Sequence, residues 1–138
     1  MTPEKLIALA QEARTMSYCP YSGFAVGAAL LCVDGSVYTG CNIENAAFGP
    51  TVCAERTAVF KAVSEGQREF AAIAVVGGMA GQEISRECPP CGVCRQVLRE
   101  FCEDDFPVYL SGDGETVRTI LLKELLPESF RAEQHFAK

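Results

Sequence analysis

Three cysteines and one glutamate are spaced along the chain in a way that suits a catalytic metal site. Cys53-Ala54-Glu55 is followed by Pro90-Cys91-Gly92-Val93-Cys94. Three thiolates can hold zinc and leave its fourth tetrahedral position open for water, whereas four protein ligands make a purely structural site. The carboxylate of Glu55, two residues from the first thiol, can move protons to and from that water. The pattern therefore predicts a hydrolytic enzyme.

The negative charge of a three-thiolate zinc site must be offset by neighbouring groups. Three thiolates and one zinc ion sum to about -1, which weakens the ion as a Lewis acid. Both cysteine motifs are expected where the chain enters a helix, and a helix N-terminus carries about half a positive charge. Arg56 can offset the remainder by donating hydrogen bonds to ligand sulfurs. Glu55 shares an i, i+4 row with Val59 and Val63, and catalysis would explain a carboxylate on that apolar row.

Two other uses of the cysteines remain open from the residues alone. Cys88 lies three residues before Cys91 and could be a fourth ligand, which would make a non-catalytic zinc protein. The same two cysteines could form a redox pair, which would need an exposed thiol of low pKa. Glu55 favours the enzyme, since a structural site has no use for it. The remaining cysteines are predicted to be small buried hydrophobic residues: Cys19, Cys32, Cys41 and Cys102.

Size and charge restrict the function further. The 138 residues suit a single domain over 1–138, with a variable tail after about residue 130. The net charge of -6 and the lack of a basic run argue against a nucleic-acid partner. The N-terminus does not look like a signal peptide, and the apolar runs are too short to span a membrane. We expect a cytoplasmic protein, where clustered cysteines are metal ligands more often than disulfides.

The segments that must position these motifs alternate between helix and strand. Thr2 can cap a helix with Pro3 in its first turn, and apolar residues recur at helical spacing as far as Met16. Asp34-Gly35 is a two-residue hairpin signal between two strand patterns. An Ala-rich stretch ending at Gly66 has the pattern of a capped helix. The predicted elements are a helix over 3–16, strands over 24–33 and 36–43, a loop over 45–50 and a helix over 53–65.

The second half of the chain continues this alternation. Residues 70–76 are apolar throughout, which fits a central strand covered on both faces, and Gly77-Gly78 is expected to end it. The later predicted elements are a helix over 91–102, strands over 107–110 and 116–120, a short helix over 121–126 and a polar tail. Helices between strands predict an α/β fold with three α/β/α layers and a five-stranded mixed sheet.

A row of small residues marks one face of the helix predicted over 53–65. Ala54, Ala58 and Ala62 recur at i, i+4 spacing, which allows another element to approach closely. That element is either the sheet of the same chain or a neighbouring subunit.

The two cysteine motifs and the glutamate together resemble the zinc-dependent nucleobase deaminases. Further segments resemble the short, homotetrameric cytidine deaminases, and the similarity extends from about Glu4 to Phe130. The segments that carry this resemblance are 21–30, 40–46, 53–58, 90–96 and 125–130. The resemblance implies a cytidine deaminase-like fold, one zinc ion per subunit and a homotetramer whose sites are completed by neighbouring subunits.

The resemblance also implies a reaction in pyrimidine salvage. Cytidine and 2'-deoxycytidine would be hydrolysed to uridine and 2'-deoxyuridine with release of ammonia. Cys53, Cys91 and Cys94 would bind the zinc. Glu55 would carry protons from water to N3 of cytosine and then to the departing ammonia.

The same resemblance assigns residues to substrate binding. Asn42 and Glu44 would hydrogen-bond the ribose, although a turn Asn and a solvated Glu explain them equally well from the residues alone. Phe24 would pack against the base, and the backbone of Ala54 would hydrogen-bond its edge. Phe130 would reach the base from a neighbouring subunit, whereas sequence alone favours an ordinary core aromatic.

Two residues depart from the family pattern. Phe48 stands where a tyrosine is usual, so a hydroxyl contact at the subunit boundary is lost, with a tuned interface or affinity expected. Cys88-Pro89 brings a thiol close to the zinc pair, which creates a liability to oxidation or metal exchange. Blasticidin-type deaminases share the zinc motifs, but Asn42, Glu44 and Phe130 favour the simple nucleoside. The acidic charge disfavours polynucleotide substrates.

Overall fold

The computed structural model describes residues 1–136 and is built on a five-stranded mixed sheet. The strand order is β2-β1-β3-β4-β5. β3 and β4 run parallel, while the other neighbouring pairs are antiparallel. The strands are β1 (Phe24–Cys32), β2 (Val37–Cys41), β3 (Phe70–Met79), β4 (Pro107–Leu110) and β5 (Arg118–Leu121). This arrangement confirms the predicted α/β fold and its mixed sheet.

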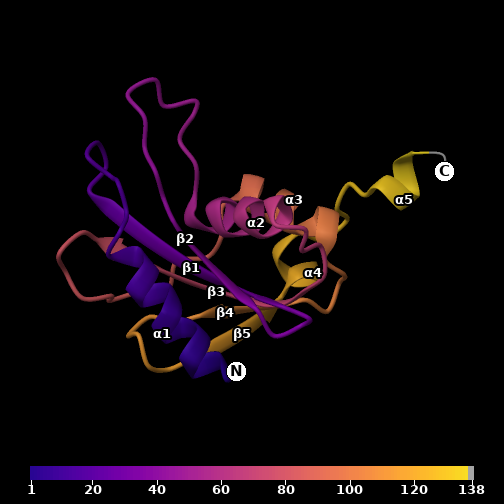
Figure 1. The fold of residues 1–138 in the computed structure, drawn as a ribbon, viewed down its shortest axis with the longest axis horizontal. Coiled ribbons are helices and arrows are strands. Elements are labelled where there is room, and N and C mark those ends of the chain that lie inside the picture. The colour runs from indigo at the N-terminus through magenta and orange to yellow at the C-terminus, as the bar shows by residue number, and fades with distance from the viewer. Residues whose placement is uncertain (137–138) are drawn as a thin grey trace.

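Helices cover both faces of the sheet (Figure 1). α1 lies on one face, while α2 and α3 lie on the other, and the segment with α5 leads away from the body of the fold. The helices are α1 (Pro3–Arg14), α2 (Ala54–Ser64), α3 (Gly92–Phe101), α4 (Leu122–Leu125) and α5 (Ala132–His135). Within residues 1–136, none of them is long and apolar enough to cross a membrane.

Each face of the sheet has its own apolar cluster. Leu6, Ile7 and Ala10 of α1 pack with Ala29 and Val76 on one face. The cluster on the other face contains the row of small residues of α2, namely Ala54, Ala58 and Ala62, all fully buried. That row therefore packs within the chain and does not form a seam between subunits.

The hairpin between β1 and β2 is longer than predicted. The amide of Cys32 donates to the carbonyl of Ser36 over 2.8 Å, which leaves three residues in the loop instead of two. Gly35 has a φ of 92°, and a left-handed glycine is usual in three-residue hairpin loops. The side chain of Asp34 accepts from the Ser36 amide over 2.9 Å. The turn residues were recognised correctly, but the two-residue loop was wrong.

Gly77-Gly78 does not end β3, contrary to prediction. The strand continues to Met79, with Gly77 paired to Val26 of β1. A Cβ atom at Gly77 would lie 2.8 Å from Sγ of Cys88, so this glycine makes room for a neighbouring side chain inside a strand.

Other boundaries differ by a few residues. α1 ends at Arg14, and the side chain of Met16 is exposed. β5 begins at Arg118 because the Asp113 side chain accepts from the Thr116 amide over 2.7 Å and holds that residue in the turn. The short α5 lies within the predicted polar tail.

Candidate metal centre

Three thiols meet at the N-termini of α2 and α3. Cys53 and Cys91 are the N-cap residues of the two helices, and Cys94 lies in the first turn of α3. Sγ of Cys91 lies 3.6 Å from Sγ of Cys53 and 3.5 Å from Sγ of Cys94, and all three atoms are within 4.8 Å of one another. Zinc–sulfur bonds of about 2.3 Å in a tetrahedron separate sulfurs by about 3.8 Å. The donor set therefore fits zinc.

The charge around the thiols is uneven. Nη2 of Arg56 donates to Sγ of Cys53 over 3.4 Å. Hydrogen bonds from Cys94 and from Arg56 lower the pKa of Cys53 to about 5, despite its partial burial. The hydrogen bond to the Cys53 thiolate, together with burial, raises the pKa of Cys94. The metal-free cluster thus holds a thiolate beside a protonated thiol, and metal binding must release that proton.

Glu55 lies beside this cluster and is shielded from water. Its side chain belongs to the first turn of α2, and the residue is only 4 % exposed. Burial raises the pKa of its carboxyl to about 7, and the Cys53 thiolate adds to the effect. A hydrogen bond with the Cys94 thiol acts in the opposite direction. A carboxyl with this pKa can both accept and return a proton near neutral pH.

Cys88 lies outside the thiol cluster. The group of mutually close ligand atoms found among residues 1–136 consists of Cys53, Cys91 and Cys94. Sγ of Cys88 packs against Gly77, and burial raises the pKa of this thiol to about 11. A half-buried thiol with a raised pKa, outside the cluster of the other three, supports neither a four-cysteine metal site nor a reactive redox pair.

The remaining cysteines only partly match their prediction. Cys32 and Cys102 are buried as expected, whereas Cys19 and Cys41 are half-buried. All eight cysteines are free thiols.

Asn42 follows β2 directly and joins it to β1. Its Nδ2 donates to the carbonyl of Phe24 over 2.8 Å, and its Oδ1 accepts from the amide of Val26 over 2.9 Å. The hydroxyl of Ser17 donates to the same oxygen over 2.5 Å. The amide is therefore held rigidly by groups distant in sequence, and one proton of Nδ2 remains for a ligand.

Glu44 is anchored by the loop that precedes β1. Its carboxylate accepts from the amides of Tyr21 and Ser22, over 2.9 and 3.1 Å, and from the Ser22 hydroxyl. These hydrogen bonds, that of the hydroxyl foremost, lower the pKa of Glu44. Sequence reasoning gave Ser22 no role, because only the fold brings its loop to Glu44. A cavity of about 400 Å³ adjoins this loop and is lined by Tyr21, Ser22, Glu44, Phe48 and Thr51.

The aromatic residues assigned to the site lie at the surface. Phe24, the first residue of β1, is 39 % exposed, and Phe130 is 53 % exposed with its ring edge-on to Phe136. Phe48 is 67 % exposed, has a φ of 61° and meets the ring of Tyr21 edge-on. The core position that sequence alone favoured for Phe130 is therefore wrong.

Ala54 differs from these aromatic residues in being fully buried. It is the first residue of α2, and its N–H has no partner within the helix. Its backbone N–H therefore lies at the N-terminus of α2, next to Cys53 of the thiol cluster.

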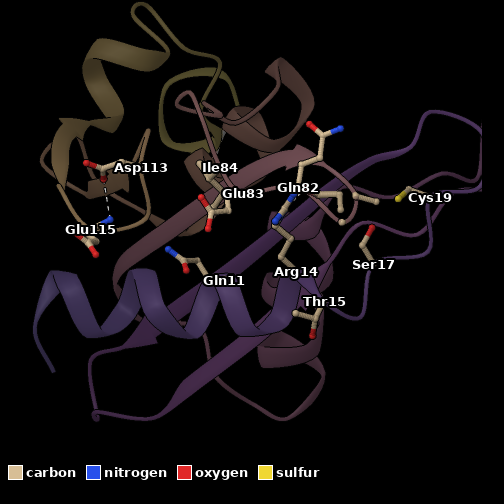
Figure 2. Close-up of a pocket in the computed structure, with 13 residues that line it drawn as sticks. Gln11, Arg14, Thr15, Ser17, Cys19, Gln82, Glu83, Ile84, Asp113 and Glu115 are labelled. Carbon is tan, nitrogen blue, oxygen red and sulfur yellow. Dashed lines mark hydrogen bonds between the residues drawn. The ribbon is translucent and has the colours of Figure 1, made fainter.

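A separate cavity of about 770 Å³ lies on the α1 side of the sheet (Figure 2). Gln11 and Arg14 of α1 line it, with Glu83 from the segment after β3. Arg14 is engaged with the carbonyls of Ala25 and Met79, at 2.9 and 2.8 Å. This cavity faces away from α2 and α3 and therefore does not extend the thiol cluster.

Comparisons with known proteins agree on one family. The profile of the cytidine and deoxycytidylate deaminase zinc-binding region matches residues 1–110. The cytidine deaminase of Sporosarcina psychrophila is 51 % identical over 133 residues, which cover 96 % of this chain and 94 % of that protein. The cytidine deaminase of Halalkalibacterium halodurans is 53 % identical over 133 residues, which cover 96 % of this chain and 97 % of that protein. The crystal structure of cytidine deaminase from Burkholderia pseudomallei matches with a TM-score of 0.83 and 48 % identity, over 94 % of this chain and 100 % of that one.

Proposed function

The chain belongs to the cytidine and deoxycytidylate deaminase family, and we propose that it hydrolyses cytidine and 2'-deoxycytidine to the uridine forms, with release of ammonia. The observation that carries this proposal is the buried carboxyl of Glu55 beside three thiols at two helix N-termini. A purely structural zinc site has no use for such a carboxyl.

The chemistry divides between the metal and the glutamate. Zinc held by Cys53, Cys91 and Cys94 supplies a water activated for attack on C4 of the base. Glu55 takes a proton from the attacking water and gives it to N3 of cytosine. It then carries the second proton of that water to the amino group, which leaves as ammonia. Its pKa of about 7 suits both transfers. Arg56 stabilises the thiolate of Cys53 and so keeps this ligand ionised.

Four further residues orient the nucleoside in this proposal. Asn42 holds the ribose through its second Nδ2 proton. Glu44 holds it through the remaining lone pair of Oε2, because Oε1 already accepts two amide hydrogen bonds. Phe24 supports the face of the base, and the N–H of Ala54 donates to its carbonyl edge. Fixing sugar and base together brings C4 to the metal centre in a reactive geometry.

Assembly completes the site. We infer a homotetramer in which Phe130 of a neighbouring subunit stacks on the base. The exposure of Phe130 and the departure of the α5 segment from the body of the fold both support this inference. Other large exposed apolar side chains, including Phe48 and Phe60, would lie in the interfaces. We further propose that the enzyme acts in the cytoplasm, where its free thiols stay reduced.

Turnover by purified, zinc-loaded protein tests the proposed function. Cytidine, 2'-deoxycytidine, cytosine and blasticidin S are offered separately, and ultraviolet absorbance and ammonia release are followed together. We expect the two nucleosides to react, and Glu55→Gln to abolish the reaction while it keeps one zinc per subunit. A zinc-loaded protein that leaves both nucleosides unchanged would refute the proposal.

A further inference from the structure

The sugar-holding and proton-moving parts of the proposed site meet at one contact between β2 and α2. β2 ends at Cys41 and leads directly to Asn42, whereas α2 carries Glu55 in its first turn. Gly40 of β2 lies against that first turn. The contact therefore joins the two segments whose spacing a bound nucleoside would have to match.

Gly40 allows an approach that no other residue permits. A Cβ atom there would lie 2.5 Å from the carbonyl oxygen of Ala54 and 2.6 Å from the amide nitrogen of Ala58. It would also lie 3.0 Å from Cβ of Thr57. The two closest atoms belong to the helix backbone and cannot rotate away. Gly40 lies in a regular paired strand, so close packing, not an unusual turn, is what requires glycine here.

The two sides of this contact have different main anchors, although Ile43, next to Asn42, is paired with Val52, next to Cys53, by two hydrogen bonds of 3.0 Å. Asn42 is tied to β1 through Phe24 and Val26 and has no hydrogen bond to α2 among those found for residues 1–136. The thiol of Cys53, by contrast, belongs to the cluster shared by α2 and α3. A side-chain atom added at Gly40 would push the first turn of α2 away from β2, whereas Asn42 would stay bonded to β1. The distance from the sugar site to Glu55 would then change.

We propose that Gly40 is a positioning residue that sets the separation between the sugar-holding end of β2 and the Glu55-bearing turn of α2. The inference rests on the proposed deamination of a nucleoside. It adds a residue that touches neither substrate nor metal, and whose replacement would misalign the base while both halves of the site stay intact.

The chain supplies a matched control on the opposite face of the same sheet. A Cβ atom at Gly27 of β1 would lie 1.9 Å from the carbonyl oxygen of Ala10 and 2.6 Å from the amide nitrogen of Arg14. Gly27 is adjacent in β1 to Ala28, the residue that pairs with Gly40. The helix that it meets, α1, carries none of the residues assigned to metal, proton or sugar. Gly27→Ala thus introduces a clash at least as severe, at 1.9 Å against 2.5 Å, on the face of the sheet opposite Glu55.

The experiment compares Gly40→Ala and Gly27→Ala in zinc-loaded full-length protein. Steady-state kinetics with cytidine, zinc content, melting temperature and the absorption spectrum of the cobalt-substituted forms are measured for both. For Gly40→Ala we expect kcat to fall about 100-fold and KM to change less than about threefold, as misplacement by about 1 Å implies. Metal content and the cobalt spectrum should match wild type. Gly27→Ala should melt at a lower temperature and keep kcat within about threefold.

Three results would overturn the inference. Gly40→Ala could keep the kcat of wild type, Gly27→Ala could lose as much kcat, or Gly40→Ala could lose its metal or change the cobalt spectrum. If Gly40→Ala does not fold, Ala58→Ser enlarges the residue whose amide nitrogen lies at this contact. Ala58→Ser should lower kcat in the same way by a smaller factor, and an unchanged kcat would refute the inference. Wild-type protein without turnover would refute the proposed function instead.

Discussion

The thiol cluster and the aromatic rim around Glu44 are built in opposite ways. The cluster and Glu55 are held by the N-termini of two helices that pack on the sheet, and the carboxyl is almost fully buried. At the rim, Phe24 and Phe48 leave large apolar areas exposed. One chain thus brings three thiols and a buried carboxyl together, whereas the aromatic side chains of the rim stay exposed.

This contrast separates two kinds of effect. Changes at the cluster should act on metal and rate within each subunit. Changes at the rim should act on substrate affinity and on assembly, because the exposed faces of these rings are accessible to a ligand or to another subunit. Each prediction below tests whether the two regions are as independent as the structure implies.

The largest effect is expected from loss of one metal ligand. Cys91→Ser should abolish stoichiometric zinc binding and lower kcat more than about 10⁴-fold, because water is no longer activated. Cys88→Ala is the matched control and should keep one zinc and nearly full activity, since its thiol lies outside the cluster. Metal analysis and turnover measure both variants, and zinc loss in Cys88→Ala would contradict the three-ligand assignment.

Removal of the buried carboxyl should slow the reaction and stabilise the metal-free fold. Glu55→Gln is expected to lower kcat by about 10⁴-fold, which is at the upper end of the contribution of a general acid–base catalyst. The pKa of Glu55 is raised by burial from 4.5 to about 7, so the folded chain binds its proton more tightly than the unfolded chain. Below pH 4.5 Glu55 is protonated in both the folded and the unfolded chain, so its ionisation costs no stability. The penalty grows as pH rises from 4.5 to 7 and then stays constant.

A shift of this size corresponds to a penalty of about 3 kcal/mol above pH 7. Metal-free Glu55→Gln should therefore exceed metal-free wild type in free energy of unfolding at pH 8 and match it near pH 4. Urea titrations at several pH values measure the difference. A variant that is less stable than wild type at pH 8 would show that burial of the ionised carboxyl does not destabilise the fold.

A moderate effect is expected at the rim. Phe24→Ala should raise KM for cytidine about tenfold, which corresponds to loss of about 1.4 kcal/mol of contact with the base, and should leave zinc content unchanged. Initial-rate kinetics with metal analysis test this. A loss of zinc in this variant would mean that rim and cluster are coupled.

The smallest effect is expected from Phe48→Tyr. The ring is 67 % exposed, so the added hydroxyl can remain hydrated, and kcat/KM should change less than about threefold. Sedimentation over a range of protein concentrations measures assembly in parallel. A large change in kcat would place Phe48 in the chemistry and end the distinction between the regions.

The cluster was predictable from the sequence because its geometry is local. Each pair lies within a single helical turn, Cys53 with Glu55 and Cys91 with Cys94. The predicted starts of the two helices also placed these thiols at helix N-termini. The mixed sheet was predictable for a related reason, since hydrophobic runs alternate with helical periodicity.

The rest of the site depends on contacts between distant segments. Glu44 is held by Tyr21 and Ser22, more than twenty residues earlier, and Asn42 by Ser17 and Phe24. Gly77 was predicted with Gly78 to end a strand, and Gly40 had no assigned role, but both are sites of close packing inside strands. Sequence patterns cannot distinguish these uses, because the neighbour that requires the glycine appears only in the folded chain.

X-ray absorption spectroscopy of the zinc-loaded protein tests the central claim most directly. The account predicts three sulfur neighbours at about 2.3 Å and one lighter atom around each zinc ion, with the same pattern in Glu55→Gln. Four sulfur neighbours would close the metal to water and contradict the account.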